Sequence, residues 1–567
     1  MDGADDTVED PVEMCRNSEE EEEASSWCLW LKSFNSRRYC DELVQLFKLA
    51  GPVILFQVMV FMISTVSMIF CGHLGKTEFS AVSLAIAVVN VTGIAIGTGL
   101  SLTCDTLISQ TFGGRQLMRV GVILQRGVLI LLLACFPCWA VLINTGPLLI
   151  AVKQSPEVAN LAQLYVKIFM PALPPAFMYQ LLGRYLQNQG IIWPQVITGA
   201  IGNILNAMIN YVLLHCLDLG VAGSAAANTI SQYVLPALLL AYIYWRGLHK
   251  ATWGGWSLEC LQEWGPFAKL AIPSMLMFCM EWWAFEVGGF LASYISEVEL
   301  GAQSVMYQLT VVSFMIPMGL SVAASVRVGN ALGAGNREQA ILSCKVSIIC
   351  ASVVACCVGI ILTLSKDVIG YIFTTDPDIL KRTADVMVLF FFMHLADSIA
   401  GVSGGVFRGA GKQKVGMFSN LVGHYLIGFP IGVTLIFATE MGVVGLWIGL
   451  TLCVVLQAIF FVLYLCKLDW RKATEEAQLR AGVQIINEGM AMVVCQPESN
   501  TEQVAGPRLS PRCESTAEGR RETASTQIRD ALSVKQLFIR RGLMFLVMVV
   551  ILVIGIISNH FLVRNLN

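Results

Sequence analysis

Two acidic side chains stand inside a long apolar run, residues 267–291, where carboxylates are rare. Glu281 lies near the middle of this run, and Glu286 follows five residues later. As a helix, a run of this length spans the ~30 Å hydrocarbon layer of a bilayer. A carboxylate at the centre of such a helix costs roughly 2.5–3.5 kcal/mol on insertion scales. The run therefore indicates that Glu281 has either a partner or a use, and the predicted use is binding of a proton or a cation.

A third acid, Asp397, stands in another apolar run, residues 383–405, three residues after His394. Side chains three apart lie on one face of a helix, so these two are expected to be neighbours. Tyr307 and Gln308 open the run that follows residues 267–291, and they are placed to approach Glu286. No lysine or arginine is expected at mid-span in this half of the chain, so no basic group is expected to neutralise the acids.

The chemistry expected of these groups is the exchange of a bound proton for a bound cation. A model-peptide Glu titrates near ~4.3, and burial away from water raises a carboxyl pKa by up to several units. A buried acid can therefore hold a proton near neutral pH and give it up to a competing cation. Two facing states and mutually exclusive ligands then suffice for antiport. The rings of Trp282 and Tyr307 would add roughly 0.5–2 kcal/mol of cation–π attraction for an organic cation, and Phe285 stands beside them in the sequence pattern as a further aromatic candidate.

Each candidate also has a purely structural interpretation. The three acids would be protonated hydrogen-bonding groups, His394 would be an interior histidine, and the aromatic residues would pack or contact lipid. Uncharged polar residues also stand within the apolar runs of the first half of the chain. They either face a substrate or form interhelical hydrogen bonds; they are Gln57, Asn90, Thr92, Asn203, Asn206 and Asn210.

The elements that must position these residues are membrane spans. The chain is 56% hydrophobic and only 14% charged, whereas soluble domains carry about 25% charged residues. Thirteen apolar runs predict an all-α polytopic membrane protein. They are residues 46–71, 80–104, 120–143, 160–182, 194–215, 223–245, 267–291, 300–322, 341–364, 383–405, 416–438, 443–466 and 543–563. The 18 cysteines lie mostly inside these runs without metal or disulfide spacing. No metal, cofactor, enzymatic activity or nucleic-acid partner is expected.

The first twelve runs form two copies of six. Three pairs of stretches match at nearly one offset: Lys48–Pro52 with Lys269–Pro273 (269 − 48 = 221), Gln110–Gly113 with Asn330–Gly333 (330 − 110 = 220), and Gly220–Gly223 with Gly442–Gly445 (442 − 220 = 222). Because six is even, both copies enter the membrane from one side, and the repeat is parallel. The sequence therefore predicts two parallel six-helix lobes around a central cleft, plus a thirteenth C-terminal helix. Glu281 and Asp397 align with Val60 and Ala176, so the acids belong to the second lobe alone.

The expected domains follow from these runs. They are a cytoplasmic tail at 1–42, an N-terminal lobe at 43–245, a cytoplasmic connector at 246–265, a C-terminal lobe at 266–466, a cytoplasmic disordered segment at 467–540, and the thirteenth helix with an extracellular end at 541–567. Lysine and arginine gather in alternate connectors, which places the N-terminus in the cytoplasm and the C-terminus outside. Asp105, near Arg115 and Arg119, is expected to be an interface charge.

Several motifs give the chain a resemblance to the multidrug and toxin extrusion (MATE) family, in particular its vertebrate plasma-membrane proton/organic-cation antiporters. They are Phe70-Cys-Gly-His-Leu-Gly75, Cys104-Asp-Thr-Leu-Ile-Ser-Gln110, Val120-Gly-Val-Ile-Leu-Gln-Arg126, Thr252-Trp-Gly-Gly-Trp-Ser257, Met280-Glu-Trp-Trp283 and Val326-Arg-Val-Gly-Asn-Ala-Leu-Gly-Ala-Gly335. The resemblance implies proton-driven export of organic cations. It also implies that Glu281 and Glu286 are family acids, whereas Asp397 and Gln308 stand where close relatives have Glu. Phe285 and Phe314 stand where those relatives have Tyr.

The sequence therefore predicts a monomeric, multi-pass antiporter of the plasma membrane, surrounded by lipid, that exports organic cations such as drugs, toxins and cationic metabolites in exchange for protons by alternating access. The alternative on the same fold is an exporter of a neutral or lipid-linked substrate. A receptor or channel with thirteen spans is the alternative of another class, and the internal repeat favours a carrier over both. The candidate coupling and binding residues are Glu281, Glu286, Asp397, Trp282, Phe285, Tyr307, Gln308, His394, Gln57 and Asn90.

Overall fold

The computed structural model describes residues 36–72, 74–439, 441–483 and 533–566, and the regular elements within them are all helices. Twelve continuous helical segments in these ranges are long and apolar enough to cross a membrane. In the first half they are α2 (Ser36–Gly72), the path α3–η1–α4–α5 (Lys76–Val89, Asn90–Ile94, Ala95–Ser101, Thr103–Gly113), α6 (Leu117–Leu142), α10–η3 (Trp193–Tyr211, Val212–Cys216) and α11 (Gly220–Trp245). In the second half they are α12 (Trp264–Ser293), α13 (Glu297–Gly333), α14 (Arg337–Leu364), α15 (Pro377–Ala410), α16–η6–α17 (Gln413–Asn420, Leu421–Gly428, Phe429–Ala438), α18 (Val443–Lys467) and α22 (Val534–Leu566).

The fourth expected run, residues 160–182, is helical but broken. It consists of α8 (Pro156–Phe169), a single 3-10 turn (Met170–Ala172) and α9 (Leu173–Gln187). The break coincides with Pro171, Pro174 and Pro175, and a proline inside a helix lacks the N–H that the preceding turn requires. All thirteen predicted runs are therefore helical in the described residues, and the all-α prediction is confirmed.

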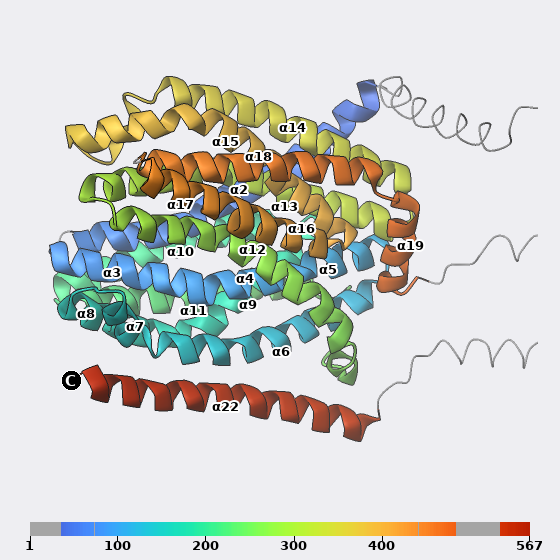
Figure 1. The fold of residues 1–567 in the computed structure, drawn as a ribbon. Coiled ribbons are helices and arrows are strands. Elements are labelled where there is room, and N and C mark those ends of the chain that lie inside the picture. Colours follow the sequence, from blue (N-terminus) through green and yellow to red (C-terminus); the bar gives the residue numbers. More distant parts are fainter. Residues whose placement is uncertain (1–35, 73, 440, 484–532, 567) are drawn as a thin grey trace, which may run out of the picture.

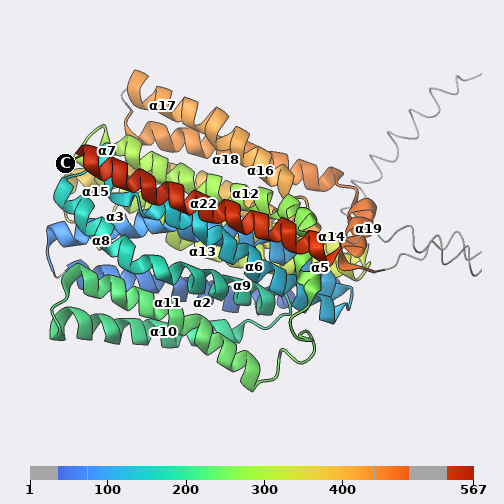
Figure 2. The ribbon, with the colours of Figure 1, turned by 90° about the horizontal axis from the view of Figure 1, so that it is seen from below.

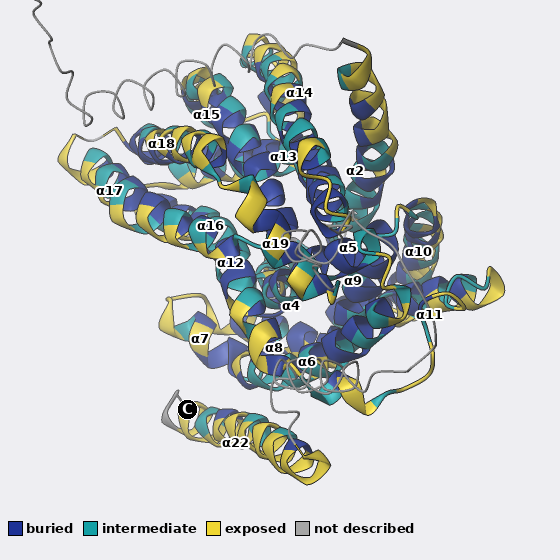
Figure 3. Ribbon diagram, turned by 90° about the vertical axis from the view of Figure 1, so that its right-hand side faces the viewer, coloured by how far each residue is buried: buried dark blue, intermediate teal, exposed yellow. Residues whose placement is uncertain are grey.

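The two lobes meet through a reciprocal pair of contacts. The first helix of the N-terminal lobe, α2, packs against α13, the second helix of the C-terminal lobe. In return, α12 packs against α4, which belongs to the second path of the N-terminal lobe. Figure 3 shows α4, α12 and α13 toward the middle of the bundle, with many buried residues, and α2 beside α13. A parallel repeat related by one axis along the bundle produces this reciprocity.

Two glycines related by the repeat bring the lobes together at one end. A Cβ on Gly113 at the end of α5 would lie 2.8 Å from the carbonyl carbon of Asn330, and a Cβ on Gly333 at the end of α13 would lie 2.7 Å from that of Gln110. Both contacts are too short for a side chain. The matching stretches 110–113 and 330–333 therefore pack on each other, and the lobes close at this end.

A further helix, α19 (Trp470–Ala481), covers the closed end and contacts α5, α13, α14 and α15. Lys412 pairs with Glu476 at 2.8 Å, and Nη2 of Arg480 donates to the carbonyl of Ala410 at 3.4 Å. Burial lowers the pKa of Arg480 while Glu476 raises it. The expected disordered segment at 467–540 is therefore wrong at its start, where these contacts hold a helix; residues 484–532 lie outside the described residues.

The helix α22 lies on the outside of the N-terminal lobe against α6 and α7 (Thr145–Ala151). Nδ2 of Asn144 donates to the carbonyl of Gly555 at 3.0 Å, and Nδ2 of Asn559 donates to that of Ile143 at 2.9 Å. Figures 1 and 2 show α22 running the length of the bundle, with the C-terminus at the end opposite α19 and the start of α2. Most of its remaining surface is exposed and apolar, which suits lipid contact.

The expected N-terminal tail ends earlier than residue 42, because α2 begins at Ser36. Glu42 is buried and accepts hydrogen bonds from Nε of Arg327 at 3.0 Å and from Oγ of Ser343 at 2.6 Å. A buried carboxylate with such partners fixes the first turns of α2 on the C-terminal lobe. Residues 1–35 lie outside the described residues.

Candidate functional site

Glu281 and Asp397 lie on one cavity inside the C-terminal lobe. The cavity has two adjoining parts of about 20 and 50 Å³, and Glu281, Trp282, Phe314 and Asp397 line both. Leu102 and Arg184 of the N-terminal lobe line the larger part, so this C-lobe cavity reaches the interface between the lobes. A space of about 10–15 Å³ admits a water molecule. The cavity therefore has room for water, but it is far below the ~300 Å³ at which ligand pockets begin.

The α12 segment that carries Glu281 is held by the path α16–η6. Nδ2 of Asn420 donates to the carbonyl of Met277 at 2.7 Å, and the hydroxyl of Tyr425 donates to that of Met280 at 3.1 Å. Gln457 donates to the amide oxygen of Asn420. Leu421–Gly428 is a π-helical segment, and such segments recur at functional sites. These contacts fix the turn of α12 that precedes Glu281 and so position its side chain.

Arg408 corrects the expectation that no basic group reaches the acids. It lies near the end of α15 and lines the larger part of the C-lobe cavity together with Glu281 and Asp397. Nη2 of Arg408 donates to Oγ of Ser321 at 2.8 Å, and in the described residues no ion pair joins Arg408 to either acid. Arg408 follows the expected run 383–405 and was therefore expected in a connector, but α15 continues to Ala410 and its guanidinium lines the cavity. The larger part of the cavity is thus lined by two acids and two arginines, of which Arg184 pairs with Asp105 and Arg408 has no ion pair in the described residues.

Glu286 faces a different neighbour from Glu281. The hydroxyl of Tyr307 donates to Oε1 of Glu286 at 3.3 Å, and the ring of Tyr307 lines the smaller part of the C-lobe cavity. Phe285 lines the same part and packs against Tyr307, with ring centroids 6.2 Å apart. Gln308 is half-buried and lies outside both parts of the cavity. Glu286 therefore touches the cavity through Tyr307.

His394 lies outside both parts of the C-lobe cavity, although it is three residues from Asp397. Its side chain is buried, and its ring stacks on Phe390 with centroids 5.5 Å apart. Nε2 of His394 has no hydrogen-bond partner in the described residues. This environment fits the structural interpretation of His394 better than a role beside Asp397.

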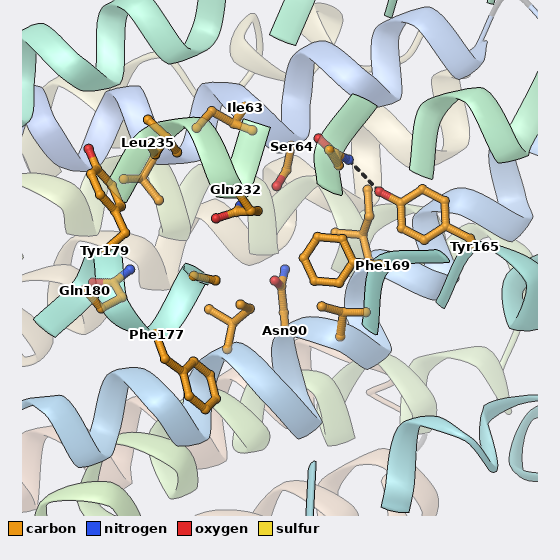
Figure 4. Close-up of a pocket in the computed structure, with 16 residues that line it drawn as sticks. Ile63, Ser64, Asn90, Tyr165, Phe169, Phe177, Tyr179, Gln180, Gln232 and Leu235 are labelled. Atoms are coloured by element: carbon orange, nitrogen blue, oxygen red, sulfur yellow. Dashed lines mark hydrogen bonds between the residues drawn. The ribbon is translucent and has the colours of Figure 1, made fainter. Parts of the chain in front are cut away.

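The N-terminal lobe has a cavity of its own, of about 90 Å³, and its lining is uncharged (Figure 4). Asn90 lines it from the π-helical segment η1, together with Ser64, Gln180 and Gln232. Asn228 Nδ2 donates to the hydroxyl of Tyr165 at 2.5 Å at its edge. Of the polar residues predicted in this lobe, only Asn90 lines this cavity. The others do not line it; they are Gln57, Thr92, Asn203, Asn206 and Asn210.

Except for Thr92, which donates to the carbonyl of Val88 one turn earlier, the remaining polar residues predicted in the N-terminal lobe join neighbouring helices. Asn206 donates to Asn228 at 3.1 Å and Asn203 to the carbonyl of Met59 at 2.8 Å. Gln57 donates to the sulfur of Met318 at 2.8 Å, across the interface between the lobes. These are the interhelical bonds of the structural alternative.

Asp105 does not lie at the membrane–water interface, as the sequence had suggested. Its side chain is fully buried, and it pairs with Arg184 at 3.4 Å and accepts from Asn188 at 3.1 Å. Arg184 also lines the C-lobe cavity, so this buried pair stands at the boundary between the lobes. The sequence suggested Arg115 and Arg119 as neighbours because they are near in the chain, whereas the partner comes from α9.

Sequence reasoning missed the groups that complete the two cavities. In the C-terminal lobe these include Arg408, Asn420, His424 and Gln457, and in the N-terminal lobe Tyr165, Gln180 and Gln232. Polar residues within apolar runs were a usable signal for Gln180, Gln232, Asn420 and Gln457. The described residues contain no cluster of three metal-ligating side chains.

Comparison with known proteins gives consistent matches. The MatE family model matches residues 52–212 and again 273–434, an offset of 273 − 52 = 221 that confirms the internal repeat. The chain is 60% identical to "Multidrug and toxin extrusion protein 1" of Danio rerio, over 94% of this chain and 93% of that protein. It is 49% identical to the protein of the same name from Homo sapiens, over 94% and 95%.

A solved structure is also similar. The crystal structure of the eukaryotic MATE transporter AtDTX14 superposes with a TM-score of 0.76 at 28% identity, covering 78% of this chain and 99% of that one. An outward-facing MATE transporter of the MOP superfamily superposes with a TM-score of 0.67 at 18% identity, over 77% and 97%, which supports the fold.

Proposed function

Because this chain belongs to the multidrug and toxin extrusion family of membrane transporters, we propose that it exports organic cations across the plasma membrane in exchange for protons. It is a transporter and not an enzyme. The curated relatives are named for extrusion of drugs and toxins, and the same activity is proposed for this chain.

One observation carries the proposal: Glu281 and Asp397 line a single C-lobe cavity that reaches the interface between the lobes, and Trp282 and Phe314 line it with them. Carboxylates in a low-dielectric space attract a proton or a cation strongly, and the aromatic rings attract an organic cation further. The N-lobe cavity offers hydrogen-bonding groups without formal charge. The charge of the transported ion would therefore be balanced in the C-terminal lobe.

The size of the C-lobe cavity supports alternating access. Parts of about 20 and 50 Å³ admit water and protons but exclude an organic cation. Entry of the cation therefore requires the lobes or their helices to part, and the two lobes give the scaffold an axis about which to do so. Protons binding Glu281 and Asp397 would release the cation on one side, and the cation would displace the protons on the other.

We place the closed end of the bundle, where α5 and α13 meet under α19, on the cytoplasmic side. Arginines and lysines gather in the connectors at this end, as the positive-inside preference requires. The N-terminus then lies in the cytoplasm, and the end of α22 lies outside the cell.

The test is uptake of labelled tetraethylammonium into vesicles that contain the purified protein, with an imposed pH gradient. Wild-type uptake should follow the gradient, and Glu281→Gln should lower it to near background. The matched control is Glu297→Gln, which removes an exposed acid from the first turn of α13 in the same lobe. Uptake by wild type that ignores the gradient would reject proton antiport and favour a neutral or lipid-linked substrate. Unchanged exchange in Glu281→Gln would reject the role of this acid.

A further inference from the structure

A larger cavity lies apart from the two transport cavities, where α6 begins. It has a volume of about 540 Å³ and is lined by the first turns of α6 and by the connector between the lobes. This volume is within the ~300–1,000 Å³ range of small-molecule sites. We call it the connector cavity. Its polar lining consists of Gln116, Arg119, Gln125, Arg126, Ser257, Glu259, Gln262 and Glu263.

The charged lining of the connector cavity balances to zero, with two arginines and two glutamates. Glu263 bridges both arginines, at 3.4 Å from Arg119 and 3.3 Å from Arg126. Arg126 is 6% exposed, and its Nε has no hydrogen-bond partner in the described residues. Glu259 is exposed, and its carboxylate forms no ion pair in the described part of the chain. Two arginines thus share one glutamate at this cavity while a second glutamate is without an ion pair in the described residues, which suits a ligand that carries both signs.

The backbone around the connector cavity holds this arrangement in place. Glu263 has a φ of 53°, in the left-handed region, which a non-glycine residue rarely adopts. Gly255 has a φ of 91° and also lines the cavity. The amide of Gln125 donates to the carbonyl of Gly255 at 2.7 Å and accepts from the N–H of Ser257 at 3.0 Å. The connector is therefore fixed on α6 around the cavity.

The connector cavity also has the surroundings of a membrane interface. Trp256, next to Gly255, is 65% exposed, and exposed tryptophans favour the headgroup level of a bilayer. Met118, which lines the cavity, is exposed as well. On the lipid side, Arg541 at the start of α22 lies 4.4 Å over the ring of Trp264 and donates from Nε to the carbonyl of Leu261 at 2.9 Å. Acyl chains would have apolar helix surface beside a headgroup held here.

We propose that the connector cavity binds the phosphoethanolamine headgroup of a membrane phospholipid. The phosphate would lie by Arg126 and Arg119, where the first turn of α6 also presents the positive end of the helix dipole. The primary ammonium would donate hydrogen bonds to Glu259. An anionic headgroup would leave this acid uncompensated, and a choline headgroup has no N–H to donate. Basic pockets between helices on the cytoplasmic side are a recurring place for lipid headgroups, and here the two acids select a zwitterion.

The test uses the full-length protein in detergent and measures its thermal stability with short-chain phosphatidylethanolamine, phosphatidylcholine or phosphatidylglycerol. Phosphatidylethanolamine should raise the unfolding temperature most. Glu259→Gln is an exposed change that should fold, and it should abolish the preference for ethanolamine over choline while strengthening the effect of phosphatidylglycerol. Arg119→Gln should weaken the effects of phosphatidylethanolamine and phosphatidylglycerol alike. Glu157→Gln, at an exposed acid in the first turn of α8, is the matched control and should change nothing.

Three results would overturn the proposal. They are equal stabilisation by the three lipids, an unchanged preference in Glu259→Gln, and free phosphoethanolamine stabilising the protein as much as the lipid, which would indicate a soluble ligand. None of these results bears on proton-coupled uptake, so the lipid site and the transport function can fail separately.

Discussion

Arg408 and Glu281 line the same cavity, yet Nη2 of Arg408 donates to Oγ of Ser321 at 2.8 Å and no ion pair joins it to Glu281 in the described residues. The positive charge of Arg408 is therefore available to pair with either carboxylate of the cavity. When the acids carry protons or a cation, Arg408 can remain on Ser321. When they lose both ligands, Arg408 can neutralise them during the return of the empty protein, because the other arginine of the cavity, Arg184, already pairs with Asp105.

Arg408→Gln should therefore change the pH dependence of exchange. Without this positive charge the ionised acids are less favoured, so protons leave the cavity only at a higher pH. The pH of half-maximal tetraethylammonium uptake should move in the alkaline direction, and maximal turnover should fall roughly tenfold, as expected when about 1.4 kcal/mol of stabilisation is lost. Ser321→Ala, which removes only the partner hydroxyl, is the milder variant and should keep the wild-type pH profile. An acid shift in Arg408→Gln would contradict this role.

Tyr307→Phe should remove the hydrogen bond that links Glu286 to the lining of the cavity and so weaken substrate binding. The variant removes the hydroxyl that donates to Oε1 of Glu286 at 3.3 Å and keeps the ring. Loss of a typical intramolecular hydrogen bond costs about 1 kcal/mol, which corresponds to a roughly fivefold change in KM. Initial rates over a range of tetraethylammonium concentrations measure it. Phe285→Leu is the comparison for the ring alone, and an equal change in both variants would show that packing, not the hydroxyl, matters.

Gln180→Ala should alter substrate preference without altering coupling. Gln180 lines the uncharged N-lobe cavity (Figure 4), whereas the acids Glu281 and Asp397 line the C-lobe cavity. The ratio of uptake between two organic cations of different hydrogen-bonding capacity should change severalfold, while the dependence on the pH gradient stays as in wild type. Gln154→Ala, at an exposed residue before α8, should change neither. Loss of gradient dependence in Gln180→Ala would mean that the two cavities act as one.

The sequence was informative where a physical constraint is local or repeated. The hydrophobic runs predicted all thirteen helical segments, and three short matches predicted the parallel repeat that the family model finds at the same offset. Glu281 and Asp397 stood out because a carboxylate in an apolar run is costly. Arg408 could not be found in this way, because only the length of α15 decides whether its guanidinium ends outside or inside the protein.

Other parts of the site depend on contacts between distant segments. His394 is three residues from Asp397, but its ring stacks on Phe390 away from the cavity. Asp105 has its partner, Arg184, on another helix. Helix periodicity gives the spacing of side chains on one helix and not which neighbour each face meets. A sequence without an alignment therefore indicates which polar residues are unusual, but not which of them lie together.

At the reciprocal glycine contact of the closed end, replacing glycine by alanine should lower the stability of the protein, although the same replacement inside most helices raises it. Replacing glycine by alanine inside a helix normally stabilises it by up to ~1 kcal/mol. At Gly113 the new Cβ would lie 2.8 Å from the carbonyl carbon of Asn330, so overpacking should cost about 1–3 kcal/mol instead. Gly113→Ala should therefore lower the unfolding temperature, and it should slow uptake by holding the lobes apart at this end.

The control is Gly289→Ala on α12, where no atom lies within 4 Å of the added Cβ, and it should leave stability equal or slightly higher. Gly333→Ala should behave as Gly113→Ala does, because its Cβ would lie 2.7 Å from the carbonyl carbon of Gln110 in the same contact. Once one alanine has separated α5 from α13, the second meets less resistance, so the double variant should lose less than the sum of the two losses. Strict additivity would show that the two glycines pack independently and that the lobes are not closed by one shared contact.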